Sequence, residues 1–321
     1  MAVNLITGGA GFIGSHLAEY LLNKGQKVII LDNLSTGRFD NIRHLVGRDG
    51  FSYIIANLTE NEYLEKALGE ADFIYHLAAA VGVQLIVENP VHTIETNIEC
   101  SARLLRLASR TGKRVLITST SEVYGKNADI PFKEDDDTTY GATSRSRWSY
   151  AFSKAVDEFL ALAYHQEKGL PVAIVRLFNT VGPRQVGHYG MVLPRFIEQA
   201  LKGGPITVYG DGNQSRCFCH VLDVVPALYE LMNCPEAMGK IINLGTEEEV
   251  TINELAEKVR SKIDASVEIR HIPYDQAYRP GFEDMQRRVP CLKRVRKYIG
   301  FNIMHSLDDI LQDMIDYQRS V

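Results

Sequence analysis

Cysteine is scarce in this chain, and its placement argues against two kinds of site. The 321 residues include five cysteines, an odd count that argues against a framework of disulfide bonds. Cys217 and Cys219 are separated by one residue and no second pair lies nearby, so the ligand spacing of a zinc site is missing. We therefore expect reduced thiols, a cytoplasmic protein and no metal centre.

Charge of one sign and long apolar runs are missing as well. The formal net charge is -5, and no basic stripe or lysine-rich tail indicates binding to nucleic acid. No apolar run approaches the length that spans a membrane. A buried-type strand follows Met1 almost at once, so we expect no signal peptide. With 45% hydrophobic and 23% charged residues, the composition is typical of a globular enzyme of one large or two modest domains.

The most informative segment is residues 1–32. A short apolar run leads into a glycine turn and an amphipathic helical pattern, and a second apolar run ends at Asp32. Gly8 suits the tight turn, Gly11 lets backbone N–H groups approach a pyrophosphate, and Gly14 lets the helix pack close to the sheet. A carboxylate at Asp32 could accept from both ribose hydroxyls and would repel a 2′-phosphate. The segment therefore predicts a site for NAD rather than NADP.

Apolar runs and helical patterns alternate over the first half of the chain. We expect strands at 3–6, 28–31, 73–77, 115–117 and 172–177. We expect helices at 13–23, 60–69, 92–110 and about 150–168. Several of the apolar runs are nearly continuous, as in parallel strands that are covered on both faces. The alternation predicts an α/β fold with a Rossmann-type, doubly wound parallel sheet.

The pattern changes after Asn179. We expect a helix at 194–201, a strand at 206–209 and further helices near 221–233, 251–263 and 306–319. This part reads as a smaller α/β domain that binds the substrate over the carboxyl edge of the sheet. The expected division gives 1–178 with about 218–246 to the NAD-binding domain, and 179–217 with 247–321 to the substrate-binding domain.

A phenol and an ammonium lie four residues apart at Tyr150 and Lys154, on one face of the expected helix. The phenol is a poor base at neutral pH because its reference pKa is about 10. A neighbouring ammonium and a positively charged nicotinamide would both favour phenolate and lower that pKa. Tyr150 could then take the proton of a sugar hydroxyl while hydride leaves for NAD+.

Hydroxyl groups and one carboxylate follow directly on the strand at 115–117. The hydroxyls of 118–121 stand at its carboxyl end, where they can hydrogen-bond a substrate oxygen. Glu122 could act as an acid or a base near the reacting carbon, or serve as a structural acceptor for the next loop. Arg145, Arg147 and Trp148 are interpreted as a solvated loop, with contact to the substrate as the alternative.

His76 lies inside an apolar run, and we interpret it as a hydrogen-bonded core residue rather than a ligand.

Together these segments resemble the extended short-chain dehydrogenase/reductases, the NAD-dependent epimerase/dehydratase family that modifies nucleotide sugars. The likeness covers essentially the whole chain. It includes T-G-G-A-G-F-I-G-S-H at the start, Y-x-x-x-K at Tyr150, F-N-T-V-G-P-R at 178–184 and R-C-F-C-H-V-L-D-V at 216–224. The resemblance implies a homodimer formed through the helices near 92–110 and 150–168, and a UDP-linked nucleotide sugar as substrate.

The resemblance also implies roles for individual residues. The catalytic residues would be Thr120, Ser121, Glu122, Tyr150 and Lys154. The residues that bind NAD would be Gly8, Gly11, Phe12, Ile13, Gly14, Asp32, Asn33, Asn57, Leu58, Leu77, Ala78, Ala79, Asn97, Tyr150 and Lys154. The residues that bind the substrate would be Asn179, Arg184, Val192, Tyr209, Arg216, Arg279 and Arg288. Among these, Asn179, Arg216 and Arg279 would hold the diphosphate, and Arg288 would face the carboxylate or the reacting sugar.

Three reactions of the family begin alike, with oxidation at sugar carbon 4. The T-S-E at 120–122 and the F-N-T-V-G-P-R at 178–184 are similar to UDP-glucuronate decarboxylases, so decarboxylation of UDP-glucuronate to UDP-xylose is the expected reaction. The alternatives are a UDP-sugar 4-epimerase, which the segment 81–84 resembles, and a sugar-nucleotide 4,6-dehydratase. Two positions depart from the pattern: Val289 replaces a lysine of the decarboxylases, and Asn57 replaces an aspartate near the adenine.

Overall fold

In the computed structural model of the chain, residues 1–81, 89–187, 191–277, 283 and 285–320 are described. Seven parallel strands form the central sheet, in the order β11-β6-β5-β4-β1-β2-β3. Their bounds are Val3–Thr7 for β1, Lys27–Asp32 for β2, Phe51–Ile55 for β3, Phe73–His76 for β4, Arg114–Thr120 for β5, Val172–Leu177 for β6 and Ile241–Leu244 for β11. The doubly wound parallel sheet predicted from the sequence is confirmed.

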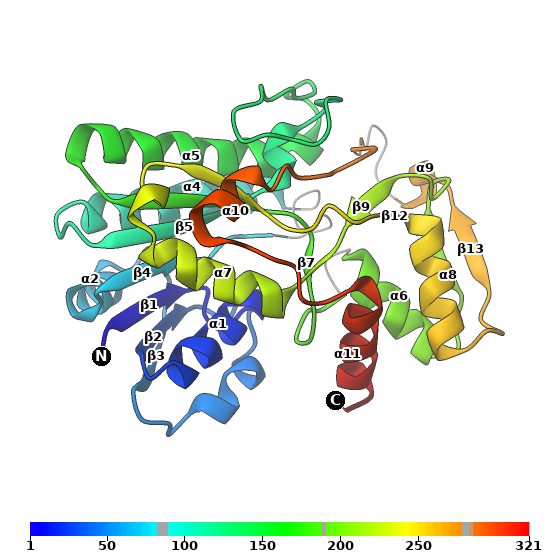
Figure 1. Cartoon of the computed structure of the whole chain (residues 1–321), viewed down its shortest axis with the longest axis horizontal. Coiled ribbons are helices and arrows are strands. Elements are labelled where there is room, and N and C mark those ends of the chain that lie inside the picture. The colour runs from blue at the N-terminus through cyan, green and yellow to red at the C-terminus, as the bar shows by residue number, and fades with distance from the viewer. Residues whose placement is uncertain (82–88, 188–190, 278–282, 284, 321) are drawn as a thin grey trace.

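Helices cover both faces of this sheet (Figure 1). One face carries α1 (Phe12–Asn23), α7 (Val221–Asn233) and α10 (Lys293–Ile299), whose apolar side chains share a core with β1, β2 and β6. The other face carries α2 (Asn61–Glu70), α4 (Pro90–Ala108) and α5 (Ser149–Lys168). The expected helices of the first half all form, with ends shifted by one or two residues.

A smaller domain continues the chain beyond the carboxyl ends of the strands. Its helices are α6 (Val192–Leu201), α8 (Ile252–Ile263), α9 (Tyr274–Ala277) and α11 (Leu307–Ser320). Its strand pairs are β8 (Ile206–Tyr209) with β13 (Ile269–Ile272), and β9 (Ser215–Cys217) with β12 (Glu249–Thr251). A separate apolar core holds α6, α8 and α11 together. Because α7 and β11 pack with the large sheet, the segment from α7 to β11 belongs to the first domain.

The chain crosses between the two domains through a short pair of strands, β7 (Thr180–Val181) and β10 (Cys219–His220). The remaining elements are the 3-10 helices η1 (Phe39–Asn41), η2 (Arg43–Leu45), η3 (Ser121–Tyr124), η4 (Ser146–Trp148) and η5 (Pro235–Ala237). None of the helices in the described part of the chain is long and apolar enough to cross a membrane.

One sequence-based interpretation of the core is confirmed. His76 is buried, and its two ring nitrogens lie 2.7 Å from the Thr7 hydroxyl and 3.1 Å from the Ser101 hydroxyl. Burial lowers the pKa of His76 to about 3, so the ring is neutral. The five cysteines, all of which fall within the described residues, are free thiols.

Candidate active site

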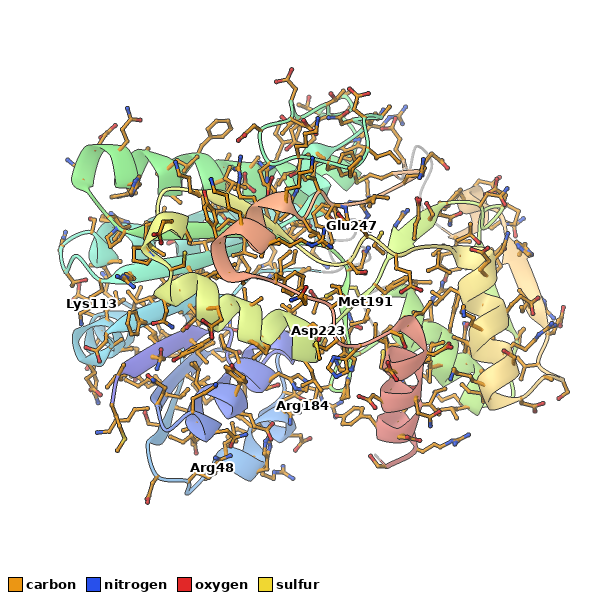
Figure 2. The ribbon with its side chains drawn as sticks, viewed as in Figure 1. Arg48, Lys113, Arg184, Met191, Asp223 and Glu247 are labelled. Carbon is orange, nitrogen blue, oxygen red and sulfur yellow. The ribbon has the colours of Figure 1, made fainter. Side chains whose placement is uncertain are left out.

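A cavity of about 720 Å³ opens between the two domains, at the carboxyl edge of the sheet. The glycine turn after β1 and the ends of β2, β4 and β5 form one side of it, and α6, β8 and β9 contribute from the smaller domain. Figure 2 shows side chains meeting between the domains, where Arg184, Met191 and Asp223 are labelled. Arg184 and Met191 line the cavity.

The glycine turn has the shape that a dinucleotide requires. Gly8 has a φ of +71°, and a Cβ there would stand 2.7 Å from the Ala78 nitrogen. A Cβ on Gly14 would overlap the Gly8 carbonyl oxygen, so the helix can approach the strand only without a side chain. At Gly11 a Cβ would meet the Gly8 oxygen at 3.1 Å and would take up space in the cavity. The turn therefore leaves the N-terminus of α1 open toward the position of a pyrophosphate.

Asp32 ends β2 at the cavity, and its carboxylate accepts two backbone hydrogen bonds. Ala10 donates from 2.9 Å and Leu34 from 2.8 Å. Burial raises the pKa of Asp32, while these two bonds oppose the rise. A carboxylate offers about four acceptor sites, so capacity remains for ribose hydroxyls. The residues present therefore fit NAD.

Tyr150 and Lys154 lie one turn apart on α5, and both line the cavity. The Lys154 Nζ is 2.7 Å from the Asp157 carboxylate, and both side chains are buried. Burial raises the pKa of Tyr150, and the negative charges of Glu122 and Asp157 raise it further, although a hydrogen bond with Thr120 lowers it. In the protein without bound cofactor the pKa of Tyr150 is therefore raised, with burial as the largest cause.

Glu122 follows β5 and is surrounded by arginines. Arg147 donates to both of its carboxylate oxygens, and the Arg288 Nη1 lies 3.4 Å from Glu122 Oε1. Burial raises the pKa of Glu122, but the charges of Arg147, Arg288 and Arg216 outweigh it and lower the pKa to about 2. At neutral pH Glu122 is therefore an anion among three cations.

The interpretation of the segment at 145–148 as a solvated loop is wrong for two of its three residues. Arg145 is exposed, but the Arg147 side chain is 3% exposed and Trp148 is 1% exposed. Trp148 packs into a small apolar core with Phe132 and Ala151, beside the start of α5. This anchor turns Arg147 inward to Glu122. The sequence did contain a signal for Arg147, because it precedes Tyr150 by only three residues and therefore lies near the active site.

The expected substrate residues line the cavity from the smaller domain and the crossing strands. Asn179 donates to the Cys217 carbonyl over 2.9 Å, and the buried Arg216 donates to the Ser215 carbonyl over 2.7 Å. The Arg195 guanidinium, which sequence reasoning missed, lies 4.0 Å from the ring centre of Tyr209. The expected substrate residues that line the cavity are Asn179, Arg184, Val192, Tyr209, Arg216 and Arg288. Arg279 lies outside the described residues.

The cavity also gathers nearly all of the expected catalytic and cofactor residues. Those that line it are Gly8, Gly11, Phe12, Ile13, Gly14, Asp32, Asn33, Asn57, Leu58, Leu77, Ala78, Ala79, Thr120, Ser121, Glu122, Tyr150 and Lys154. Asn97 lies behind this wall, where it accepts from the Ala80 nitrogen at 2.7 Å and donates to the Ser153 hydroxyl over 3.1 Å. Asn97 therefore supports the wall, because its amide bonds are directed at the segment after β4 and at α5.

These features define a dinucleotide-dependent enzyme with a tyrosine and a lysine beside the cofactor cavity. A family model described as the NAD dependent epimerase/dehydratase family matches residues 4–245, and the chain belongs to this family. It is therefore an NAD-dependent enzyme, as its glycine turn and Asp32 predicted.

Similar proteins carry more particular names. The chain is 41% identical to the UDP-N-acetyl-alpha-D-glucosaminuronate decarboxylase of Bacillus cytotoxicus, over 99% of this chain and 98% of that protein. It is 38% identical to UDP-glucuronic acid decarboxylase 1 of Danio rerio, over 98% of this chain and 72% of the relative. The solved UDP-Glucuronic acid 4-epimerase from Bacillus cereus, in complex with UDP-Glucuronic acid and NAD, superposes with a TM-score of 0.89. That structure is 26% identical and covers 99% of each chain.

Proposed function

We propose that this protein decarboxylates a UDP-linked hexuronic acid through a 4-keto intermediate, with UDP-glucuronate giving UDP-xylose. The observation that carries the proposal is the excess of arginine beside Tyr150. The charges of three guanidiniums act on the single Glu122 carboxylate, so the carboxylate of a substrate would meet several cations at this wall of the cavity. A planar guanidinium can bind both oxygens of such a group.

The two arginines on Glu122 suggest which of them receives the substrate. Arg147 binds both oxygens of Glu122 and its side chain is 3% exposed, whereas the Arg288 side chain is 12% exposed and contacts one oxygen at 3.4 Å. Arg288 is the more accessible cation and the more weakly tied of the two to Glu122. We therefore assign the sugar carboxylate to Arg288, and we assign Arg147 to holding Glu122 in place.

The first step falls to the residues at the end of β5 and the start of α5. Bound NAD+ supplies the hydride acceptor. Tyr150 takes the proton of the carbon 4 hydroxyl, Thr120 orients that hydroxyl, and Lys154 holds the cofactor ribose. The resulting ketone makes the sugar a β-keto acid, in which the bond from carbon 5 to the carboxylate can break. Its electron pair moves toward the carbon 4 oxygen as carbon dioxide leaves.

Carbon 5 then takes a proton, and the ketone is reduced to give the pentose. Because the pKa of Glu122 is held near 2, its carboxylate has no proton to give at neutral pH while both arginines remain in place. In this proposal Glu122 is a counter-ion that positions Arg288. A water molecule or Tyr150 is left as the proton donor.

The same site could instead return hydride to the opposite face of the ketone, which would make the protein a 4-epimerase. The likeness to a solved UDP-Glucuronic acid 4-epimerase favours this alternative. The epimerase-like segment 81–84 lies outside the described residues from position 82 onward. A 4,6-dehydratase has less support, because the two similar proteins described above are named decarboxylases.

Product analysis tests these reactions directly. The purified protein would be incubated with UDP-glucuronate, UDP-N-acetylglucosaminuronate and UDP-glucose, and the products followed by mass spectrometry and carbon dioxide release. Loss of carbon dioxide from either uronate supports the proposal and identifies the group at sugar carbon 2. Conversion to UDP-galacturonate or UDP-galactose supports the epimerase instead. If none of the three were turned over, both readings would fall.

We also propose a homodimer, formed through the outer faces of α4 and α5. On α5, Phe159 is 76% exposed, and Phe152 and Val156 are 38% and 41% exposed. On the adjacent α4, Val91 and Ile94 are also exposed. Exposed apolar side chains on two packed helices are typical of a contact between subunits.

Three leucines on α4 are buried in the core and do not contribute to this surface. These are Leu104, Leu105 and Leu107.

We also propose which domain binds which ligand, and where in the cell the protein is located. We assign NAD to 1–178 with about 218–246, and the nucleotide sugar to 179–217 with 247–321, except that α10 within this last segment packs on the large sheet. The lining of the cavity supports this division, because its glycine turn belongs to the first part and Tyr209 and Arg216 belong to the second. Free cysteines support a cytoplasmic location.

A further inference from the structure

The loop after β7 is fastened to α1, the helix that carries the glycine turn. The His16 ring nitrogen Nε2 lies 2.9 Å from the Pro183 carbonyl oxygen. Arg184 donates to Glu19 over 2.6 Å and to the Ser15 hydroxyl over 3.4 Å. We call these contacts the clasp. Its two halves come from residues 165 or more positions apart in the sequence.

The protonation states of the clasp suit its contacts. Burial lowers the pKa of His16 to about 4, and the charge of Arg184 adds to this, so the neutral ring can donate its Nε2–H to the Pro183 oxygen. Burial raises the pKa of Glu19, but the hydrogen bond and charge of Arg184 outweigh it and lower the pKa. Near neutral pH, Glu19 and Arg184 are therefore oppositely charged.

The backbone of the loop also points to a specific role. Arg184 has a φ of 70°, a left-handed conformation that is unfavourable for a residue with a Cβ. Its side chain is 16% exposed and reaches from the loop after β7 to Glu19 on α1. The ion pair therefore holds the loop in a shape that the backbone alone disfavours.

The clasp joins two sides of the cofactor cavity. The first turn of α1 lines the cavity through Gly11 and Phe12, and the loop lines it through Arg184 and Gln185. Figure 2 places Arg184 between α1 and the smaller domain. Within the described residues, Glu19 does not line the cavity. It can therefore influence a bound dinucleotide only through its partners.

We propose that the clasp retains NAD, and that Glu19 is a positioning residue that acts through Arg184. The loop lies across the cavity from the helix N-terminus that would face the pyrophosphate, and we expect separation of loop and helix to speed the release of the cofactor. An enzyme that oxidises and reduces the same sugar in one cycle has no need to exchange its cofactor. The inference requires bound NAD and does not depend on which sugar is processed.

The test measures how fast NAD leaves the holoenzyme in the absence of substrate. Wild type, Glu19→Gln, Arg184→Gln and the double variant would be desalted, and the NAD left on the protein quantified over time after denaturation. We expect Glu19→Gln to lose NAD about tenfold faster than wild type. The same substitution should add nothing in the Arg184→Gln background.

His44→Gln is the matched control, because His44 contacts the same Glu19 carboxylate at 3.2 Å from an exposed position. It should retain NAD like wild type. Melting temperatures of the NAD-free proteins separate retention from stability.

Three results would overturn the proposal. One is a Glu19→Gln variant that keeps NAD as long as wild type or longer, which would mean that Glu19 only masks the charge of Arg184. Another is equal loss from His44→Gln, and the last is additive effects in the double variant.

Discussion

The two sides of the cavity differ in how their charges are balanced. On the side formed by β5 and α5, Lys154 is matched by Asp157 at 2.7 Å, so this pair adds no net charge next to Tyr150. On the side formed by Glu122, the charges of three arginines act on one carboxylate. The neutral pair suits a proton transfer from any sugar hydroxyl, whereas the positive excess suits a substrate that brings a negative charge. The comparison separates the chemistry of oxidation from the selection of the substrate.

The largest effect is expected on the first side. Tyr150→Phe removes the group that takes the hydroxyl proton and should lower kcat by about 10³-fold. Bound NAD should be retained, because the glycine turn and Asp32 are untouched. Kinetics with UDP-glucuronate and quantification of the bound cofactor check both expectations. Substantial remaining activity would contradict the role of this phenol.

The next largest effect is expected at Arg288, on the side of the cavity that contains Glu122. Arg288→Gln should lower kcat/KM for UDP-glucuronate about 100-fold, because the substrate carboxylate loses its charged partner. Binding of UDP, measured by calorimetry, should change little. Arg287→Gln is the control, since Arg287 is 55% exposed and pairs with Glu249 at 2.6 Å. Equal losses in the two variants would remove the assignment of the carboxylate to Arg288.

The charge imbalance should also be visible in stability at acid pH. The pKa of Glu122 falls from 4.5 to about 2 in the fold, so its ionised form stabilises the protein above pH 4.5. This contribution is lost as the pH falls toward 2. The difference in unfolding free energy between wild type and Glu122→Gln should shrink by about 2 kcal/mol between pH 5 and 3. Urea denaturation measures it.

Glu65→Gln, on the exposed face of α2, serves as the control for the acid series. The difference in unfolding free energy between wild type and Glu65→Gln should not shrink in the same way between pH 5 and 3. If the difference in unfolding free energy between wild type and Glu122→Gln stayed constant, Glu122 would have an ordinary pKa.

The smallest effect concerns the outer face of α5, behind the neutral side. Phe159→Ala should weaken the proposed dimer about tenfold, because a largely exposed aromatic ring would be lost from each half of the contact. Light scattering over a dilution series would show it. Met304→Ala removes a side chain that is 78% exposed elsewhere and should leave the assembly unchanged. A wild-type monomer would contradict the dimer.

Sequence reasoning worked best where the signal is local. The five expected strands of the sheet are present, because their apolar runs are buried on both faces. Two strands of the sheet were not predicted. Both are edge strands: β3 leaves Tyr53 and Ile55 partly exposed, and Asn243 interrupts the short apolar run of β11.

The arginines around Glu122 were only partly predicted from the sequence. Arg288 was expected near the reacting sugar, but Arg147 was assigned to a solvated loop. The segment between β5 and α5 has no helical or strand period, so its burial could not be read from the pattern. Its shape comes from apolar side chains such as Tyr124 and Trp148, which pack with Met285 from a distant part of the chain.

The sequence by itself determined the parallel sheet, the glycine turn, Asp32 and the spacing of Tyr150 and Lys154, because each depends on residues close together in the chain. Only the tertiary structure decided the charge state of the cavity. Lys154 meets Asp157 through burial as well as spacing, and Glu122 meets Arg147 and Arg288 through folding of segments far apart. Burial and long-range contacts set each pKa, and neither is written in the local order of residues.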